Sequence, residues 1–253
     1  MTTTALGSYG LAVCVLGALL AGAADAADVT REQVIEVLDA ASERRPADLA
    51  GKDLSRLDLA GIDFKRAKLS GANLSGTIMA RANLFGAQLT SAVLIGAVLS
   101  GANLDIALLG DANLTKADLT KASLFGVLLT RATLVEANLS GARIIANMSN
   151  ANLTGANLSG ADMAADMRNQ PMGLMRVFLT SANLTGANLS GANLARAELS
   201  FANLSGADLT GANLFGADVS GANFDHAILR GIRGKAEMKG WSSAKNVDTV
   251  IFE

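Results

Sequence analysis

Residues 181–224 read SANLTGANLSGANLARAELSFANLSGADLTGANLFGADVSGANF, and leucine or a leucine substitute returns at every fifth residue. An alanine stands two places before each of these positions. Helices repeat at about 3.6 residues and strands at about two, so neither element explains a period of five. A chain that turns a corner every five residues does explain it, and such a chain must wind into a solenoid.

The same five-residue frame extends over most of the chain. It runs without a break from Leu49 to Ile144, loses one residue before Met148, and continues to Met163. It resumes at Leu174 and runs through Leu229, which leaves 164–176 as an irregular loop. Between Leu49 and Ile144 the residue two before the frame position is usually alanine, with these exceptions: Lys52, Leu57, Ile62, Thr77 and Val127.

The repeat A-(N/D)-L-x-x, written here as ANL, ADL, AEL and ADV, resembles the signature of the pentapeptide repeat family over residues 49–229. The resemblance implies an all-β solenoid, a right-handed quadrilateral β-helix with four pentapeptides per coil. The central residue and the alanine two before it would point inward, and the other three outward. The frame positions then give about nine coils at a strand spacing of about 4.8 Å, or about 43 Å in length. We assign 47–231 to this β-helix.

The N-terminal residues are typical of an export signal. Residues 5–24 are apolar and small and run into Ala24-Asp25-Ala26, the small-x-small pattern that signal peptidase cleaves. We expect 1–26 to be a signal peptide and the mature protein to be periplasmic or secreted, without a membrane anchor. No Lys or Arg precedes the apolar run, and an uncleaved anchor is the alternative. Lipidation of Cys14, the only cysteine, is a third and weaker alternative.

Each end of the solenoid has a candidate cap. Residues 30–44 predict a helix with a capping box of Thr30 and Gln33 and an apolar stripe, and we assign 27–46 to an N-terminal capping helix. The tail 232–253 leaves the frame and predicts a C-terminal cap in which Trp241 packs on the last coil. Covers are expected because an end coil exposes backbone groups and an apolar cross-section.

Composition and charge exclude several function classes. The formal net charge is −2, which argues against a basic protein that tracks phosphates and against an acidic mimic of nucleic acid. His226 is the only histidine, and the mature chain would have no cysteine, so a nucleophile–histidine site of the usual kind cannot be assembled. We therefore expect no enzyme activity, no cofactor and no nucleic-acid partner.

Metal sites are not expected either. Asp48, Asp53, Asp58 and Asp63 recur every five residues, but successive repeats lie on successive faces, so their carboxylates point in four directions. Methionines gather around the irregular loop 164–176. Thioethers can bind copper(I), but methionine is also the flexible side chain that fills irregular packing, which is the interpretation we adopt.

One edge of the early coils collects bulky apolar residues at outward positions. Residues twenty apart stack on adjacent coils, so outward positions can be sorted by face from the sequence alone. Most of them are Ser, Thr, Asn, Gly or charged. Contiguous exposed apolar surface usually marks an interaction site. The expected interaction surface, which we call the apolar strip, consists of Phe85, Ile106, Leu108, Phe125, Leu128 and Ile145.

Two function classes remain. The first is an exported, non-catalytic scaffold that presents a rigid surface to a protein partner or to a second copy of the chain. The second is a binder or protector of a DNA topoisomerase such as gyrase, which some pentapeptide repeat proteins are because they resemble duplex DNA in shape and charge. The expected export and the nearly neutral charge both weigh against the second class.

Overall fold

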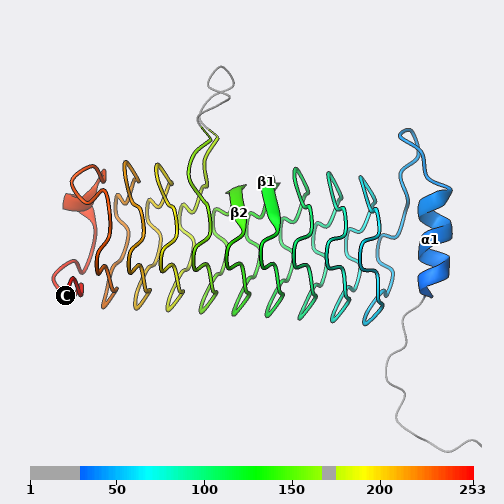
Figure 1. Cartoon of the computed structure of the whole chain (residues 1–253), viewed down its shortest axis with the longest axis horizontal. Helices are drawn as coiled ribbons and strands as arrows, with labels where there is room; N and C mark the ends of the chain where they lie inside the picture. The colour runs from blue at the N-terminus through cyan, green and yellow to red at the C-terminus, as the bar shows by residue number, and fades with distance from the viewer. Residues whose placement is uncertain (1–28, 167–174) are drawn as a thin grey trace, which may run out of the picture.

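The computed structural model describes residues 29–166 and 175–253. The expected signal peptide, 1–26, and Leu174 lie outside these residues. The described chain winds into a long solenoid with a helix at one end and the C-terminus at the other (Figure 1). Parallel bridges join successive coils, and each links residues twenty apart over the early coils, as Asp48 with Lys68. Within the described ranges, no helix is long and apolar enough to cross a membrane.

The bridges define four faces of the coil, which we call A to D. Each face is a ladder of outward residues with one member per coil. The ladders begin as Asp48, Lys68, Gln88 on face A; Asp53, Asn73, Val93 on face B; Asp58, Ile78, Val98 on face C; and Asp63, Asn83, Asn103 on face D. Each five-residue repeat therefore forms one side of a four-sided coil.

Each corner is a tight turn that begins at the frame leucine. The N–H of Lys52 donates to the carbonyl of Leu49 over 3.3 Å, and Gly51 between them has a φ of 65°. A positive φ at the third residue of such a turn is the geometry of a type II turn, which favours glycine. The same position recurs every five residues and explains why glycine is so frequent in the repeat.

The inward residues form one continuous core. The frame leucines and the alanines two before them are buried, as the repeat predicts. Thr77 is also fully buried, and its hydroxyl donates to the carbonyl of Leu54 over 3.0 Å, so this polar exception is satisfied. Lys52 is exposed and Leu57 and Ile62 are half-buried. These three belong to the first coil, which has no coil before it.

Where the frame loses one residue, the described residues form two strands, β1 (Ser123–Leu128) and β2 (Arg143–Asn147). They pair in parallel, but the register shifts so that Phe125 faces Ile145 and Val127 faces Ala146. Gly126 is left as a bulge in β1, with a φ of 70°. Ala146 has no positive φ, so β2 passes this corner without the usual turn.

The irregular loop leaves and re-enters the wall at two bridged residues. Ala165 still donates to the carbonyl of Ala195 over 3.1 Å, so the wall extends to this point. Asp166 and Met175 then form an antiparallel bridge. Leu174, where the frame was expected to resume, lies outside the described residues. After the loop, Val177 is buried and its carbonyl accepts from the N–H of Glu198 over 3.0 Å, and Phe178 pairs with Asn147 on face A.

The N-terminal helix α1 (Arg31–Asp39) begins with the expected capping box between Thr30 and Gln33. It is shorter than the expected 30–44, because Ala40 ends it and the following residues form a separate turn. Val34 is fully buried in the core of the solenoid, and Leu38 packs beside it. Arg31 donates a hydrogen bond to the carbonyl of Asp58, at the edge of face C.

The C-terminal tail leaves the five-residue period but stays in the ladder. Lys239, Lys245 and Ile251 pair with the preceding coil at spacings of 21, 22 and 23 residues, so the tail forms a wider turn than the repeats. It contains the short 3-10 helix η2 (Trp241–Ser243). The Trp241 ring lies 5.2 Å from the ring of Phe224, the last aromatic residue of the core.

Candidate interaction surface

The structure brings most of the apolar strip to one corner, where face D turns into face A. Ile106, Leu108 and Leu128 are exposed, at 44%, 39% and 45%. Phe85 and Phe125 are half-buried. Leu108 and Leu128 are bridged partners on adjacent coils. The corner therefore presents a compact apolar surface on a wall whose other outward residues are mostly polar.

Ile106 is the most unusual residue of the strip. Its φ is 54°, in the left-handed region that a β-branched side chain rarely adopts. Its side chain lies between two glycines of the neighbouring coils: a Cβ on Gly126 would be 3.1 Å from Ile106 Cγ2, and one on Gly86 would be 3.7 Å from Cδ1. The flanking glycines thus leave room for an isoleucine in a conformation that costs about 1–2 kcal/mol.

Ile145 is a correction to the expected strip. It was expected to face outward beside Phe125, but only 3% of it is exposed. The cause is the one-residue loss at this corner, because β2 continues straight where the other coils turn outward. The exposed strip therefore ends at Leu128, and Ile145 belongs to the packed wall.

A cavity of about 320 Å³ adjoins this end of the strip. Its lining includes Leu128 and Ile145 from the wall, and Met175 and Phe178 from the segment that returns from the loop. The bulge at Gly126 and the missing turn at Ala146 produce this dent. Its volume is within the range of small-molecule and side-chain pockets, at the lower end.

Polar groups limit the strip on its face D side. Asp105 lies between Phe85 and Phe125 along the axis, as expected from the sequence. Its carboxylate accepts hydrogen bonds from Ser123 Oγ over 2.6 Å and from the N–H of Phe125 over 2.9 Å. Asp105 thus fixes the backbone of the next coil. A second polar group on this side is Lys65, whose Nζ lies 6.0 Å from the centre of the Phe85 ring.

Ion pairs join coils at the next corner. Arg131 forms two hydrogen bonds with Asp111, of 2.8 and 2.7 Å. The hydrogen bond from Arg131 holds the pKa of the Asp111 carboxyl below its usual value. Both side chains are largely exposed, so the pair adds little to stability but sets a polar limit on that side of the strip.

His226 and the methionines near the loop are among the residues that we considered for chemistry from the sequence. His226 is highly exposed, and its Nδ1 lies 2.8 Å from Asp225 Oδ1. No three His, Cys, Asp or Glu residues within 29–166 and 175–253 come together as metal ligands do. Of the methionines near the loop, Met163 is buried in the core and Met175 lines the cavity, while Met167 and Met172 lie outside the described residues.

Two exposed apolar residues of the early coils, both outside the strip, were not predicted. Ile78 on face C is 42% exposed, and Ile95 is 41% exposed. Ile78 stands where the repeat has Asn or Asp, and Ile95 stands where it has Ser or Thr. Comparing each repeat with the consensus would have found both residues.

The comparison with protein families matches the segments that carry the five-residue repeat. The profile of the family described as Pentapeptide repeats matches in 8 copies, over residues 47–81, 82–107, 107–144, 146–164, 174–211 and 192–231. The chain belongs to the pentapeptide repeat family. Members of this family form right-handed quadrilateral β-helices, and they are generally non-catalytic scaffolds. A search among curated proteins found no match.

Solved pentapeptide repeat structures resemble the chain at low identity. HetL, involved in heterocyst differentiation regulation in the cyanobacterium Nostoc sp. strain PCC 7120, is 28% identical over 88% of this chain and 94% of HetL, with a TM-score of 0.39. A trypsin-treated variant of QnrB1, a plasmid-mediated fluoroquinolone resistance protein, is 20% identical over 68% of this chain and 88% of QnrB1, with a TM-score of 0.53. The likeness to QnrB1 supports the fold alone.

Proposed function

We propose that this pentapeptide repeat protein is an exported, non-catalytic scaffold of about nine coils that binds a protein partner through the apolar strip. In this proposal α1 and the C-terminal tail are caps that keep the ends of the solenoid from pairing with other chains. The signal sequence 1–26 is the basis for export, and the partner is either another protein or a second copy of this chain.

The observation that carries the proposal is Ile106. A β-branched residue with positive φ is unfavourable, and glycine occupies the same corner position one coil before and one coil after it. Glycine at position 106 would relieve the backbone strain. An exposed isoleucine kept in a strained conformation, next to exposed Leu108 and Leu128, indicates a surface retained for contact with a partner rather than for stability.

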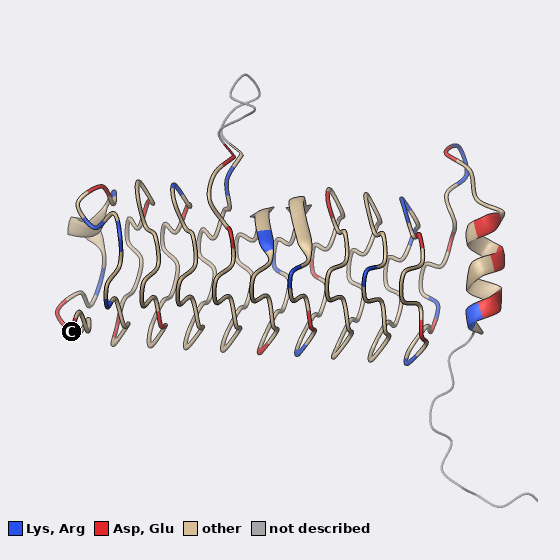
Figure 2. Ribbon diagram, viewed as in Figure 1, with Lys and Arg blue, Asp and Glu red and all other residues tan. Residues whose placement is uncertain are grey.

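The charge distribution favours this function over the topoisomerase alternative. Figure 2 shows acidic and basic residues interspersed along the solenoid, with long stretches that carry neither. A mimic of duplex DNA needs a continuous acidic surface. The corner ion pairs, such as Arg131 with Asp111, neutralise carboxylates that could contribute to one.

The test is a double change, Ile106→Gly and Leu128→Ser, in the full chain. It should abolish association, measured by light scattering for a second copy and by pull-down from the exported fraction for another protein. Relief of strain and loss of apolar burial oppose each other, so the free energy of unfolding should change by no more than about 1 kcal/mol. Phe201→Ser is the control, because Phe201 is 65% exposed and lies outside the strip.

Two results would contradict the proposal. Association that survives the double change would show that the strip is not the interface. N-terminal sequencing of the protein from a bacterial host should begin at Ala27 or within a few residues of it. A mature product that keeps Met1 and remains in the cytoplasm would contradict export.

A further inference from the structure

In the described part of the chain, the first coil has an unpaired backbone edge on face D. In later coils, each ladder residue forms two backbone hydrogen bonds with the coil before it. Lys68, for example, donates its N–H to the carbonyl of Ala47, and its carbonyl accepts from the N–H of Leu49, both over 2.8 Å. Asp63 is the corresponding residue of the first coil on face D. Among the described residues, its N–H and C=O have no backbone partner. This edge has the groups needed to pair with one more strand.

The segment before the first coil does not cover this edge. Ser42 and Arg45 pair with each other instead, through reciprocal backbone hydrogen bonds of 2.9 and 3.0 Å. Pro46 follows and has no N–H to offer. Helix α1 does donate one hydrogen bond to the first coil, from Arg31 at its N-terminal end to the carbonyl of Asp58. Asp58 belongs to face C, so this bond does not cover face D. Within 29–166 and 175–253, the path of the chain therefore leaves face D of the first coil open.

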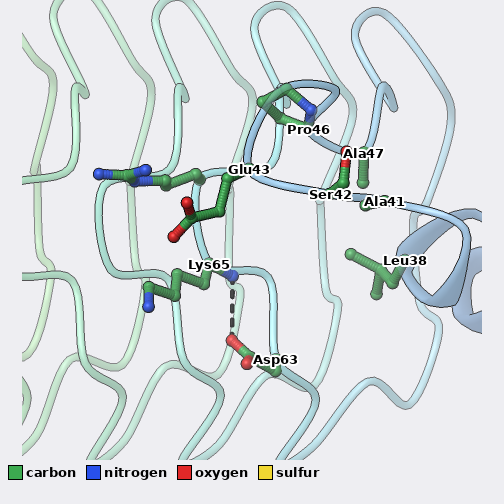
Figure 3. A pocket seen from close by; sticks show the side chains of 9 residues that line it. Leu38, Ala41, Ser42, Glu43, Pro46, Ala47, Asp63 and Lys65 are labelled. Carbon is green, nitrogen blue, oxygen red and sulfur yellow. Dashed lines mark hydrogen bonds between the residues drawn. The ribbon is translucent and has the colours of Figure 1, made fainter.

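A cleft of about 190 Å³ lies along this open edge (Figure 3). Leu38 and Ala41 from the end of α1, together with Pro46 and Ala47, give it an apolar wall. The opposite side is the first coil itself, where Asp63 Oδ1 accepts the N–H of Lys65 over 3.0 Å. The lining also contains four charged residues: Glu43, Asp63, Lys65 and Arg66.

We propose that this cleft binds an extended peptide from a partner protein by parallel strand addition. Main-chain bonds supply affinity and side-chain pockets supply selectivity in this mode of recognition. The register follows from the ladder: one peptide residue accepts from Asp63 N–H, and the residue two places later donates to Asp63 O, as Ala47 and Leu49 do with Lys68.

The same register defines the peptide that fits. In the ladder, the residues that make these two bonds, Ala47 and Leu49, are buried. The corresponding peptide residues therefore turn their side chains toward Leu38 and Ala41 and should be apolar, with any residue between them. A parallel peptide then runs toward Lys65 and Arg66, which favour an acidic residue at its C-terminal end. This cleft shares no residue with the apolar strip, so it is a second contact site, independent of the proposed function.

The test begins with a phage-displayed library of seven-residue peptides in which Ala-x-Leu is fixed, selected on the mature full-length protein. The best peptide is then made with a fluorescent label and titrated by anisotropy. Asp63→Pro removes the N–H from the edge, whereas Asp63→Ala keeps it. Both variants lose the same side-chain bonds, to Lys65 N–H and to Asn83 Nδ2. Thermal unfolding checks that they fold equally well.

Strand addition predicts that Asp63→Pro binds the peptide at least about tenfold more weakly than wild type, while Asp63→Ala stays within about threefold. N-methylation of the peptide leucine should weaken binding to the wild-type protein to a similar extent. Failure to enrich any peptide would overturn the proposal. So would equal binding to the proline variant, because the peptide would then lie elsewhere.

Discussion

Asn73 Nδ2 donates a hydrogen bond of 3.0 Å to Oδ1 of Asp53, its partner on the preceding coil. The Oδ1 of Asn73 in turn accepts from the N–H and the hydroxyl of Ser75, over 3.1 and 2.7 Å. One side chain thus closes its own corner and ties two coils together. The pattern recurs along the solenoid and gives a physical reason for Asn or Asp before the leucine.

Replacement of Asn73 tests this double role. Asn73→Ala removes both the corner bonds and the link to Asp53, and should lower the free energy of unfolding by about 1–2 kcal/mol in urea denaturation. Asn73→Asp keeps the corner bonds but places a second carboxylate next to that of Asp53. The loss of unfolding free energy relative to wild type should therefore be larger at pH 7 than at pH 3, where one of the two carboxylates is protonated. A loss of stability in Asn73→Asp that does not change with pH would contradict the contact between residues 53 and 73.

Asp218 should contribute to the pH dependence of stability. The hydrogen bond from the Ser220 hydroxyl, 2.6 Å long, lowers the pKa of the Asp218 carboxyl below its ordinary value. A carboxyl whose pKa is lower in the folded state stabilises above its unfolded pKa of about 3.9, and this contribution is lost as the pH falls through the folded value.

The measurement for Asp218 compares thermal unfolding of wild type and Asp218→Asn between pH 2 and pH 7. The melting temperature of the variant should be the lower one at neutral pH, and the difference should shrink below about pH 4. Asp208→Asn is a useful control, because Asp208 makes the same type of bond to Thr210, at a more exposed site. If the difference in melting temperature between wild type and Asp218→Asn stays constant with pH, Asp218 is not a source of the pH dependence.

Helix α1 should stabilise the N-terminal end through Val34. This residue is fully buried against the first coil, and Val34→Asp would bury an unpaired charge at a cost of several kcal/mol. We expect a clear loss of thermal stability or the onset of aggregation, measured by circular dichroism and light scattering. Glu36→Gln, on the exposed side of the helix, should change little. Equal effects of the two substitutions would show that α1 is not a cap.

Gly240 should be far less replaceable than a glycine of the regular corners. A Cβ at Gly240 would lie 2.6 Å from Ser220 Cα, which belongs to the backbone of the coil beneath. At Gly211, with a similar φ of 68°, no atom lies within 4 Å. Gly211→Ala should cost about 1–2 kcal/mol of unfolding free energy, from backbone strain alone. Gly240→Ala should cost more and separate the tail from the last coil.

Hydrogen exchange can locate the effect of Gly240→Ala. Loss of protection should concentrate at Lys239, Lys245 and Ile251, whose N–H groups pair with the preceding coil. Gly211→Ala should leave these three amides protected. If both variants lose the same protection and the same stability, the tail is not packed as closely as described.

The sequence by itself determined the parts of the fold that repeat. A period of five with Leu and Ala at fixed places specifies an inward pair, an outward triplet and a corner, and each of these depends only on neighbours in the same coil or the next. The burial of Leu54, the turn at Gly51 and the capping box of Thr30 with Gln33 were all predictable for this reason.

Only the tertiary structure decided what happens where the period breaks. Ile145 has the spacing of an exposed residue, yet it is buried, because one missing residue lets β2 pass the corner without a turn. The tail has no five-residue period, yet it pairs with the last coil over Ile228 and Ile251. The open edge at Asp63 depends on where Ser42 and Arg45 place their hydrogen bonds. At such points the chain conformation is set by the coil it packs against, which a local pattern does not contain.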